Sequence, residues 1–181
     1  KLIHLCAAFI PLSLKYFYAP VLVLLSVVLI FYIIAEFLRY KGYSVPLISV
    51  ITQTAARKRD ENKFVLGPVT LTLGRILTAL FFDYKSASVG IYALALGDGL
   101  ASLVGKIFGR TILSFTKGKT VEGSLACFSA IFVSCFLVTK NASTSLIIAL
   151  IGMFIELLPL KDFDNFFIPI VLAFVMQYLL P

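Results

Sequence analysis

Charged side chains are scarce in this sequence, and tryptophan is absent. Of 181 residues, 14% are charged and 60% are hydrophobic, and the mean hydropathy is +1.02. An ordinary soluble domain covers its surface with charge and contains roughly 25% charged residues. The scarcity of charge therefore excludes an ordinary soluble domain and predicts a chain whose surface largely faces lipid. In the absence of tryptophan, tyrosine takes the interfacial aromatic role.

Cysteine is also rare, and acidic residues are outnumbered by basic ones. Cys6, Cys127 and Cys135 lie in apolar stretches, and their spacing indicates neither a disulfide framework nor a zinc site, so we expect reduced core residues. The 9 acidic and 16 basic residues give a formal net charge of +7. In a membrane protein such an excess usually sets topology or meets anionic headgroups and phosphates. We therefore expect no nucleic-acid partner.

Long apolar runs stand in place of the missing charge. A membrane-spanning helix needs about 20 mostly apolar residues. We identify seven candidate segments, over residues 2–18, 20–39, 64–82, 87–105, 121–139, 143–160 and 166–181. The sequence contains no repeat and no low-complexity tract. The predicted fold is an all-α, polytopic transmembrane helical bundle with about seven membrane segments, forming a single integral-membrane domain over residues 1–181.

The first apolar segment has some features of a signal peptide. Residues 2–14 are apolar, but no small-residue cleavage site follows, and Lys15 leads straight into another apolar run. We therefore expect this segment to be part of the mature structure. Because the chain starts at Lys1 and not at methionine, we also expect the native N-terminus to be longer.

Basic residues fall almost entirely on one side of the predicted bundle. If the 39–63 loop is cytoplasmic, twelve lysines and arginines lie inside and three, Lys15, Lys85 and Lys140, lie outside, a strong positive-inside bias. The same topology brings six polar residues toward the inside: His4, Glu36, Asp98, Glu122, Glu156 and Asp164. We therefore expect one site on the cytoplasmic face. Within the loop, residues 43–56 have the mixed pattern of an interfacial helix.

Asp98 is the most informative of these residues. It lies between Gly97 and Gly99, near the inner end of the segment 87–105, where the glycines allow backbone or ligand to approach closely. Ionisable groups inside membrane segments are costly and are functional candidates. A carboxylate here suits Mg²⁺, which takes oxygen ligands and shares them with substrate phosphates. The alternative is a structural ion pair with Lys106 or Arg75.

The loop after Asp98 is basic and punctuated by glycine. Its basic residues are Lys106, Arg110, Lys117 and Lys119. Such side chains, together with backbone N–H groups at a helix start, make an anion site; the alternative is a solvated loop that only sets topology. Gly118-Lys119-Thr120 resembles the end of a P-loop, but Leu113 stands where the first glycine would fall.

Other polar residues leave two interpretations open. Glu122 follows the basic loop and suits a second metal ligand or an orienting partner for Lys119. Asp162 and Asp164 precede the last segment, where they either cap its helix or bind metal. His4 and the Glu36/Arg39 pair, whose members are three residues apart, also fit ordinary interfacial groups.

Two stretches carry a resemblance to a known family. The run Ala95-Leu96-Gly97-Asp98-Gly99-Leu100-Ala101-Ser102-Leu103-Val104-Gly105-Lys106, followed by Gly118-Lys119-Thr120-Val121-Glu122-Gly123-Ser124, resembles the CTP-dependent lipid kinases. This family includes dolichol kinase, phytol kinase and the CTP-dependent diacylglycerol kinase, and is related to the phosphatidate cytidylyltransferases. Lys1-Leu2-Ile3-His4, Glu36 with Arg39, and Glu156 with Asp164-Asn165 also resemble family positions, so the similarity covers nearly the whole chain.

The resemblance implies transfer of the γ-phosphate of CTP to a lipid alcohol (a polyprenol, a phytol-like alcohol or diacylglycerol), with Mg²⁺ as cofactor and CDP as the second product. Phosphoryl transfer needs positioning and charge neutralisation. The implied catalytic residues are Asp98, Glu122, Lys119 and Asp164, of which the carboxylates are also the metal ligands. The implied nucleotide-binding residues are Lys106, Arg110, Lys117, Lys119, Gly97, Gly105, Gly123, His4 and Asn165.

Three other functions compete with a kinase, of which a purely structural membrane scaffold would not need Asp98. Phosphatidate cytidylyltransferases carry a glycine-rich turn before paired aspartates near the C-terminus, and the stretch Asp162-Phe163-Asp164-Asn165 has no such glycines. A transporter would also place carboxylates in membrane segments, but the charges gather at one face and no inverted repeat is found.

The kinase interpretation places the protein in a membrane with CTP and a lipid alcohol as partners. We expect the inner cell membrane in a bacterium, or the endoplasmic reticulum or plastid membrane in a eukaryote, with the active site on the cytoplasmic face. Whether the protein forms a homodimer is left open by the sequence.

Overall fold

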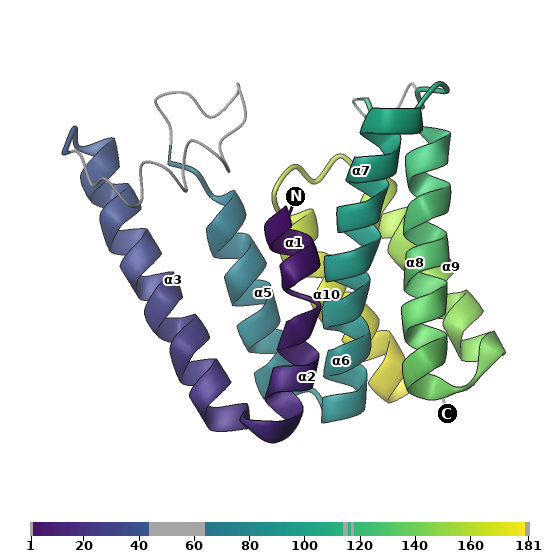
Figure 1. Ribbon diagram of the computed structural model, residues 1–181, viewed down its shortest axis with the longest axis horizontal. Coiled ribbons are helices and arrows are strands. Elements are labelled where there is room, and N and C mark those ends of the chain that lie inside the picture. The colour runs from purple at the N-terminus through teal and green to yellow at the C-terminus, as the bar shows by residue number, and fades with distance from the viewer. Residues whose placement is uncertain (1, 44–63, 114–115, 117, 180–181) are drawn as a thin grey trace.

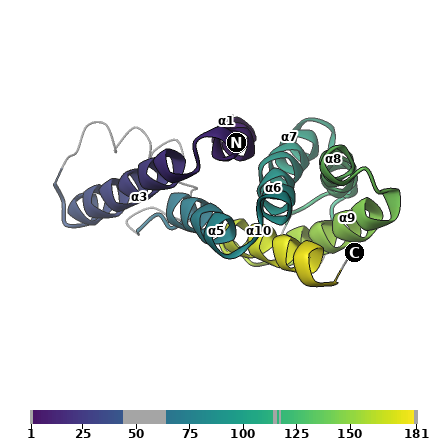
Figure 2. The same ribbon diagram turned by 90° about the horizontal axis from the view of Figure 1, so that it is seen from below.

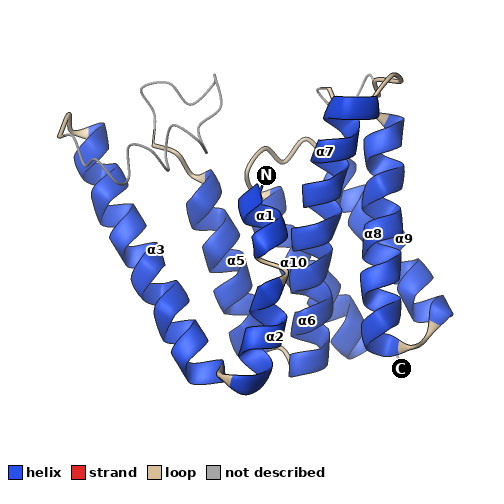
Figure 3. Cartoon of the chain, viewed as in Figure 1, coloured by secondary structure: helices blue, strands red, loops and turns tan. Residues whose placement is uncertain are grey.

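The chain folds into a bundle of helices. The computed structural model describes residues 2–43, 64–113, 116 and 118–179, and Figures 1 and 3 show helices joined by loops. Within these residues no strand is formed, and Ile112 and Thr120 make an isolated antiparallel bridge. The elements are α1 (Leu2–Cys6), α2 (Phe9–Tyr16), α3 (Tyr18–Tyr40), α5 (Gly67–Phe81), α6 (Tyr84–Tyr92), η2 (Ala93–Asp98), α7 (Gly99–Phe108), α8 (Val121–Thr139), α9 (Ala142–Leu157), α10 (Asp164–Phe174) and η3 (Val175–Leu179), where η2 and η3 are π-helical. The predicted all-α class is confirmed.

Among the described residues, three helices are long and apolar enough to cross a bilayer. They are α3 with 23 residues, the continuous helix Tyr84–Phe108 with 25, and α8 with 19. At a rise of 1.5 Å per residue these helices are about 28 to 38 Å long, which matches a hydrocarbon core of about 30 Å. Three further apolar helices are shorter, namely Gly67–Phe81, Ala142–Leu157 and Asp164–Tyr178. The predicted number of seven membrane segments is therefore not confirmed.

The first predicted segment, 2–18, is divided into two short helices. A turn at residues 7–8 separates α1 from α2. Neither helix is long enough to span a bilayer alone, but α1 packs on η2 and α2 packs on α3 and α6. The break therefore places α1 beside the segment that carries Asp98.

The core lies where η2, α8, α9 and α10 meet. Leu94, Ile131, Ile148 and Leu172 have no exposed surface there. Viewed from below, α3 stands at one edge of the bundle and α8 and α9 at the other, with α6, α7 and α10 between them (Figure 2). Most of the large apolar side chains of α3 are exposed, as expected of a helix that faces lipid.

Glu36 fastens α3 to the chain that leads into α5. Arg39 donates from Nε and Nη2 to the two Glu36 carboxylate oxygens, at 2.8 and 2.7 Å. The Val65 N–H donates to Glu36 Oε1 at 2.9 Å, and the Tyr32 hydroxyl donates to the Val65 carbonyl at 3.2 Å. Glu36 has no exposed surface. The predicted Glu36/Arg39 pair is thus formed, with Glu36 buried and the Arg39 side chain 27% exposed, and it anchors α3 to this segment.

Polar connections gather at one end of the bundle. Figure 1 shows the C-terminal ends of α3 and α7 and the N-terminal ends of α5 and α8 at the upper end, whereas the α2–α3, α5–α6 and α8–α9 turns lie at the lower end. Lys15 near the end of α2, Lys85 near the start of α6 and Lys140 after α8 lie in or beside these lower turns. The three basic residues that the sequence assigned to the outside therefore lie together at the lower end of the bundle. The predicted interfacial helix over 43–56 lies, but for Tyr43, outside the described residues.

Candidate active site

A cavity of about 430 Å³ lies at the polar end, among α7, the start of α8 and the connection from α9 to α10. Its charged lining residues are Asp98, Lys106, Lys119, Glu156, Lys161 and Asp164. They come from segments far apart in the sequence, and the tertiary fold brings three lysines and three carboxylates around one space. Such a set can bind phosphate groups and hold a divalent cation beside them.

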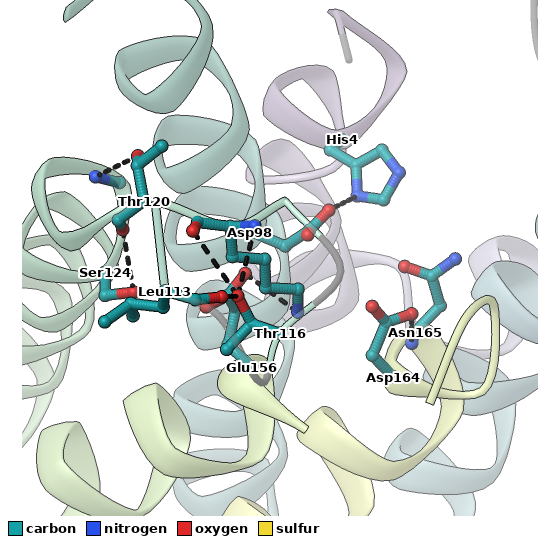
Figure 4. A network of polar contacts seen from close by, with 11 residues as sticks. His4, Asp98, Leu113, Thr116, Thr120, Ser124, Glu156, Asp164 and Asn165 are labelled. Atoms are coloured by element: carbon teal, nitrogen blue, oxygen red, sulfur yellow. Dashed lines mark hydrogen bonds and ion pairs between the residues drawn. The ribbon is translucent and has the colours of Figure 1, made fainter. Parts of the chain in front are cut away.

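Asp98 is the last residue of the π-helical turn η2. It is 8% exposed, and its Oδ2 lies 3.1 Å from His4 Nδ1 (Figure 4). Ten helical residues follow it in α7, so Asp98 lies further inside the helix than the sequence predicted. π-helical turns are frequent at functional sites because they displace one residue from the regular helical pattern. The alternative ion pair with Lys106 or Arg75 is not formed.

The glycines that flank Asp98 serve helix packing. A Cβ on Gly97 would come within 2.8 Å of Ile131 Cγ1 on α8, and a Cβ on Gly99 within 2.9 Å of Leu5 Cδ2 on α1. Gly97 therefore admits α8, and Gly99 admits α1 with His4. The sequence predicted that these glycines allow a close approach, but the approaching groups are neighbouring helices.

Gly105 and Gly123 have a similar effect between α7 and α8. A Cβ on Gly123 would lie 2.8 Å from the Ala101 carbonyl oxygen and 3.3 Å from Gly105 Cα. Both glycines line the cavity. The close crossing at this point carries Lys106, the residue after Gly105, to the cavity edge. Thr120 begins α8 by accepting the Gly123 N–H at 3.2 Å, an N-cap contact.

The loop before α8 aims Lys119 into the cavity. The Leu113 N–H donates to the Lys119 carbonyl at 2.9 Å, and the buried Thr116 hydroxyl donates to the Leu113 carbonyl at 2.7 Å. Gly118 has φ +103°, a left-handed conformation that favours glycine. Lys119 Nζ then forms an ion pair with Glu156 Oε1 at 3.0 Å.

Glu122 does not take part in this cluster. Both of its carboxylate oxygens accept the Thr111 N–H, at 3.2 and 3.4 Å, and Glu122 is not one of the described residues that line the cavity. The carboxylate beside Lys119 belongs to Glu156 on α9. Glu156 was absent from the predicted catalytic set, although a carboxylate at the end of an apolar helix is itself a signal of function.

Asp164 also lines the cavity, and Asn165 follows it in the first turn of α10. Both residues are buried, and Figure 4 shows their side chains facing the same space. α10 begins after Phe163 without a side-chain cap, while Asp164 Oδ1 accepts the Asn165 N–H at 2.9 Å. Of the two interpretations given for Asp162 and Asp164, a side-chain cap at the helix N-cap position is not formed, while Asp164 does lie in the first turn of α10.

The carboxylates fit a magnesium ion that is shared with a substrate. Among the described residues, no group of three His, Cys, Asp or Glu side chains forms a metal site by itself, so the predicted trio with Glu122 is not assembled. Asp98 and Asp164, however, line the same cavity. Mg²⁺ usually takes one or two carboxylates and completes its shell with phosphates and water, and these two residues fit that pattern.

The cavity brings together about half of the residues predicted for the site. Those that line it are Asp98, Lys106, Lys119, Asp164, Gly105 and Gly123. Described residues that lie outside the lining are His4, Gly97, Arg110, Glu122 and Asn165, of which His4 contacts Asp98 directly. Lys117 lies outside the described residues. Glu156 and Lys161 also line the cavity; the sequence analysis placed Glu156 on this face but gave neither residue a catalytic or binding role.

Comparison with known proteins identifies the family. An uncharacterized protein of Methanocaldococcus jannaschii is 30% identical over 141 residues, which cover 76% of this chain and 70% of that protein. Phytol kinase 1 of Arabidopsis thaliana is 26% identical over 148 residues, or 71% of this chain and 48% of the kinase. The dolichol kinase of Saccharomyces cerevisiae is 31% identical over 109 residues, or 58% of this chain and 20% of the kinase. Further relatives are a farnesol kinase and a CTP-dependent diacylglycerol kinase.

The chain belongs to the CTP-dependent lipid kinase family. The matched regions span less than half the length of the named kinases. No family model matches the sequence, and no solved structure matches it. The resemblance deduced from the run around Asp98 is thereby confirmed at the level of the family.

Proposed function

We propose that the chain is the catalytic domain of a membrane lipid kinase, which transfers the γ-phosphate of CTP to a lipid alcohol and releases CDP. The observation that carries this proposal is the cavity in which Asp98, Asp164 and Glu156 face three lysines at one end of an apolar bundle. The names of the related kinases describe lipid alcohols as their substrates. A phosphate-binding cavity next to apolar helices is what such a reaction needs.

The lysines of the cavity bind the nucleotide phosphates in this proposal. Lys106 and Lys119 approach from α7 and from the start of α8, and Lys161 approaches from the connection before α10. Their positive charges stabilise the charge that spreads over the phosphoryl oxygens during transfer. Asp98 and Asp164 would hold Mg²⁺, which would neutralise phosphate charge. Glu156 is the counterion of Lys119 when no nucleotide is present.

The reaction forms one bond and breaks another. The lipid hydroxyl oxygen forms a bond to the γ-phosphorus, and the bond from that phosphorus to the oxygen bridging the β-phosphate breaks. CDP leaves, and the hydroxyl proton passes to a carboxylate of the cavity. His4 positions Asp98 through their 3.1 Å contact, which prevents the carboxylate from rotating away from the cavity.

One assay tests the proposed reaction. Purified protein is incubated with Mg²⁺, CTP labelled in the γ-phosphate, and in turn farnesol, phytol, dolichol, diacylglycerol or phosphatidate. We expect CDP and a labelled lipid phosphate with at least one alcohol, and lower activity with ATP or GTP. Formation of pyrophosphate from CTP and phosphatidate would instead establish a cytidylyltransferase and refute the kinase.

We further propose that the cavity faces the cytoplasm. Single cysteines at Lys58 and Lys117, on the basic side of the sequence, should react with an impermeant thiol reagent only from the cytoplasmic side. A cysteine at Lys140, at the opposite end of α8, should react only from the other side. Labelling of positions 58 and 117 from opposite sides would refute a shared cytoplasmic face.

A further inference from the structure

Arg75 is a buried cation outside the cavity lining. It lies in the middle of α5 and is 4% exposed. Its Nε and Nη2 atoms have no hydrogen-bond partner, and it forms no ion pair with a carboxylate of the described residues. Its neighbours one turn away along α5, Leu71 and Ala79, are packed in apolar clusters.

This arrangement is costly for a guanidinium group. Arginine stays protonated in proteins, and a buried charge without a partner is strongly unfavourable. Two other basic residues of the bundle have carboxylate partners, since Arg39 pairs with Glu36, and Lys119 with Glu156. We therefore infer that the partner of Arg75 is an anion that is not part of the described chain.

The position of Arg75 limits what that anion is. A Cβ on Gly74 would lie 2.8 Å from the Asn165 carbonyl oxygen, so α5 crosses α10 next to Asp164, which lines the cavity. The N-terminal residue of α5, Gly67, lies near Asp162, and helical side chains lean toward the N-terminus of their helix. The Arg75 side chain therefore leans toward the cavity end, from within the apolar bundle.

We propose that Arg75 binds the phosphate group of a lipid phosphate on the apolar side of the cavity. This inference rests on the proposed function, because a lipid phosphate is the product of that reaction. The apolar body of a lipid phosphate suits the surroundings of Leu71 and Ala79. The planar guanidinium of Arg75 suits the phosphate oxygens, which it can bind in pairs. The nucleotide phosphates have their own lysines on the polar side.

Binding measurements on three variants test the proposal. The full chain in dodecyl maltoside, a detergent without phosphate, is titrated with farnesyl phosphate, farnesol, CTP and inorganic phosphate. Arg75→Gln removes the charge, and Arg75→Lys keeps the charge but loses the planar fork. Lys85→Gln removes an exposed charge at the far end of the bundle and serves as the matched control.

We expect Arg75→Gln to weaken farnesyl phosphate binding by at least about tenfold, as the loss of charged hydrogen bonds implies. Arg75→Lys should be intermediate, and Lys85→Gln should bind like the wild type. Farnesol and CTP binding should be unchanged in all variants. The ligand-free Arg75→Gln protein should be at least as heat-stable as the wild type, because it loses an uncompensated charge.

Several results would overturn the inference. Unchanged farnesyl phosphate binding in Arg75→Gln removes its basis, and an equal loss of CTP or inorganic phosphate binding assigns the residue to nucleotide or free phosphate. A strongly destabilised Arg75→Gln protein shows that Arg75 has a partner within the protein. An active kinase whose product binding ignores Arg75 refutes this inference alone. An inactive protein that binds farnesyl phosphate through Arg75 refutes the proposed function alone.

Discussion

Replacing Glu156 by glutamine removes the charge that faces Lys119 while it keeps the size of the side chain. The pair is 3.0 Å long, with the Glu156 side chain 7% and the Lys119 side chain 26% exposed. Hydrogen bonds to charged groups contribute about 1.5–3 kcal/mol, and the partial exposure of Lys119 reduces this value through solvent screening. We expect Glu156→Gln to lower the stability of the ligand-free protein by about 1–2 kcal/mol. For a chain of this size that is a decrease in Tm of about 2–8 °C.

Nucleotide should reverse this loss. In the wild type, a phosphate that binds Lys119 must compete with Glu156, whereas in Glu156→Gln the ammonium group is available. Because a ligand stabilises the folded state according to its affinity, CTP should raise the Tm of Glu156→Gln by more than it raises that of the wild type. Thermal unfolding of both proteins with and without CTP measures the two effects.

The double variant Lys119→Gln/Glu156→Gln is the control for this experiment. Removing both partners of a buried pair is often nearly neutral, so its ligand-free Tm should return toward that of the wild type. Its response to CTP should be the smallest of the three proteins. If Glu156→Gln unfolds at the wild-type temperature and responds equally to CTP, the ion pair does not contribute to stability and Lys119 does not bind the nucleotide.

Three further substitutions test the site and its frame. Asp98→Asn keeps the shape of the side chain but not its charge, so it should fold normally, lose turnover and lose the Mg²⁺-dependent part of CTP affinity. A destabilised but active enzyme would show that the contact of Asp98 with His4 is only structural. Gly99→Val places atoms against Leu5 and should lower the free energy of unfolding by about 1–3 kcal/mol through overpacking. We expect a lower kcat and an unchanged KM for CTP. An unchanged kcat would show that the His4 contact is dispensable. Asp83→Ala removes the cap of α6, where the carboxylate accepts two N–H groups. It should lower stability by about 0.5–2 kcal/mol without changing turnover per folded molecule. A selective loss of turnover would contradict a purely structural role.

The same cap has a defined pH dependence. Partial burial alone would raise the pKa of Asp83, but the hydrogen bonds from Ser86 and Lys85 outweigh it and hold the pKa below its ordinary value. A carboxyl group whose folded-state pKa is lowered stabilises the fold above the unfolded-state pKa and loses this contribution as the pH falls through the folded-state value. The difference in Tm between the wild type and Asp83→Ala should therefore shrink on acidification.

The sequence by itself determined the helices, their polarity and several members of the site. Apolar runs such as 20–39 and 121–139 predict α3 and α8 closely, because a long stretch without charge leaves the backbone few alternatives to a helix in lipid. Asp98 and Lys119 were recognised because a carboxylate in an apolar run and a lysine between glycine and threonine are unusual in themselves. Family membership also followed from these local motifs.

Only the tertiary structure decided which residues meet. Glu156 and Lys119 are separated by 37 positions in the chain, and their 3.0 Å contact depends on how α9 packs on α8. Glu122 is three positions from Lys119 in the sequence, yet its side chain turns to the Thr111 N–H. Gly97 and Gly99 are visible in the sequence, but only the structure shows that α8 and α1 are the groups that pack against them. Contacts between helices depend on packing angles and side-chain volumes summed over the whole bundle, and a local pattern does not contain that information.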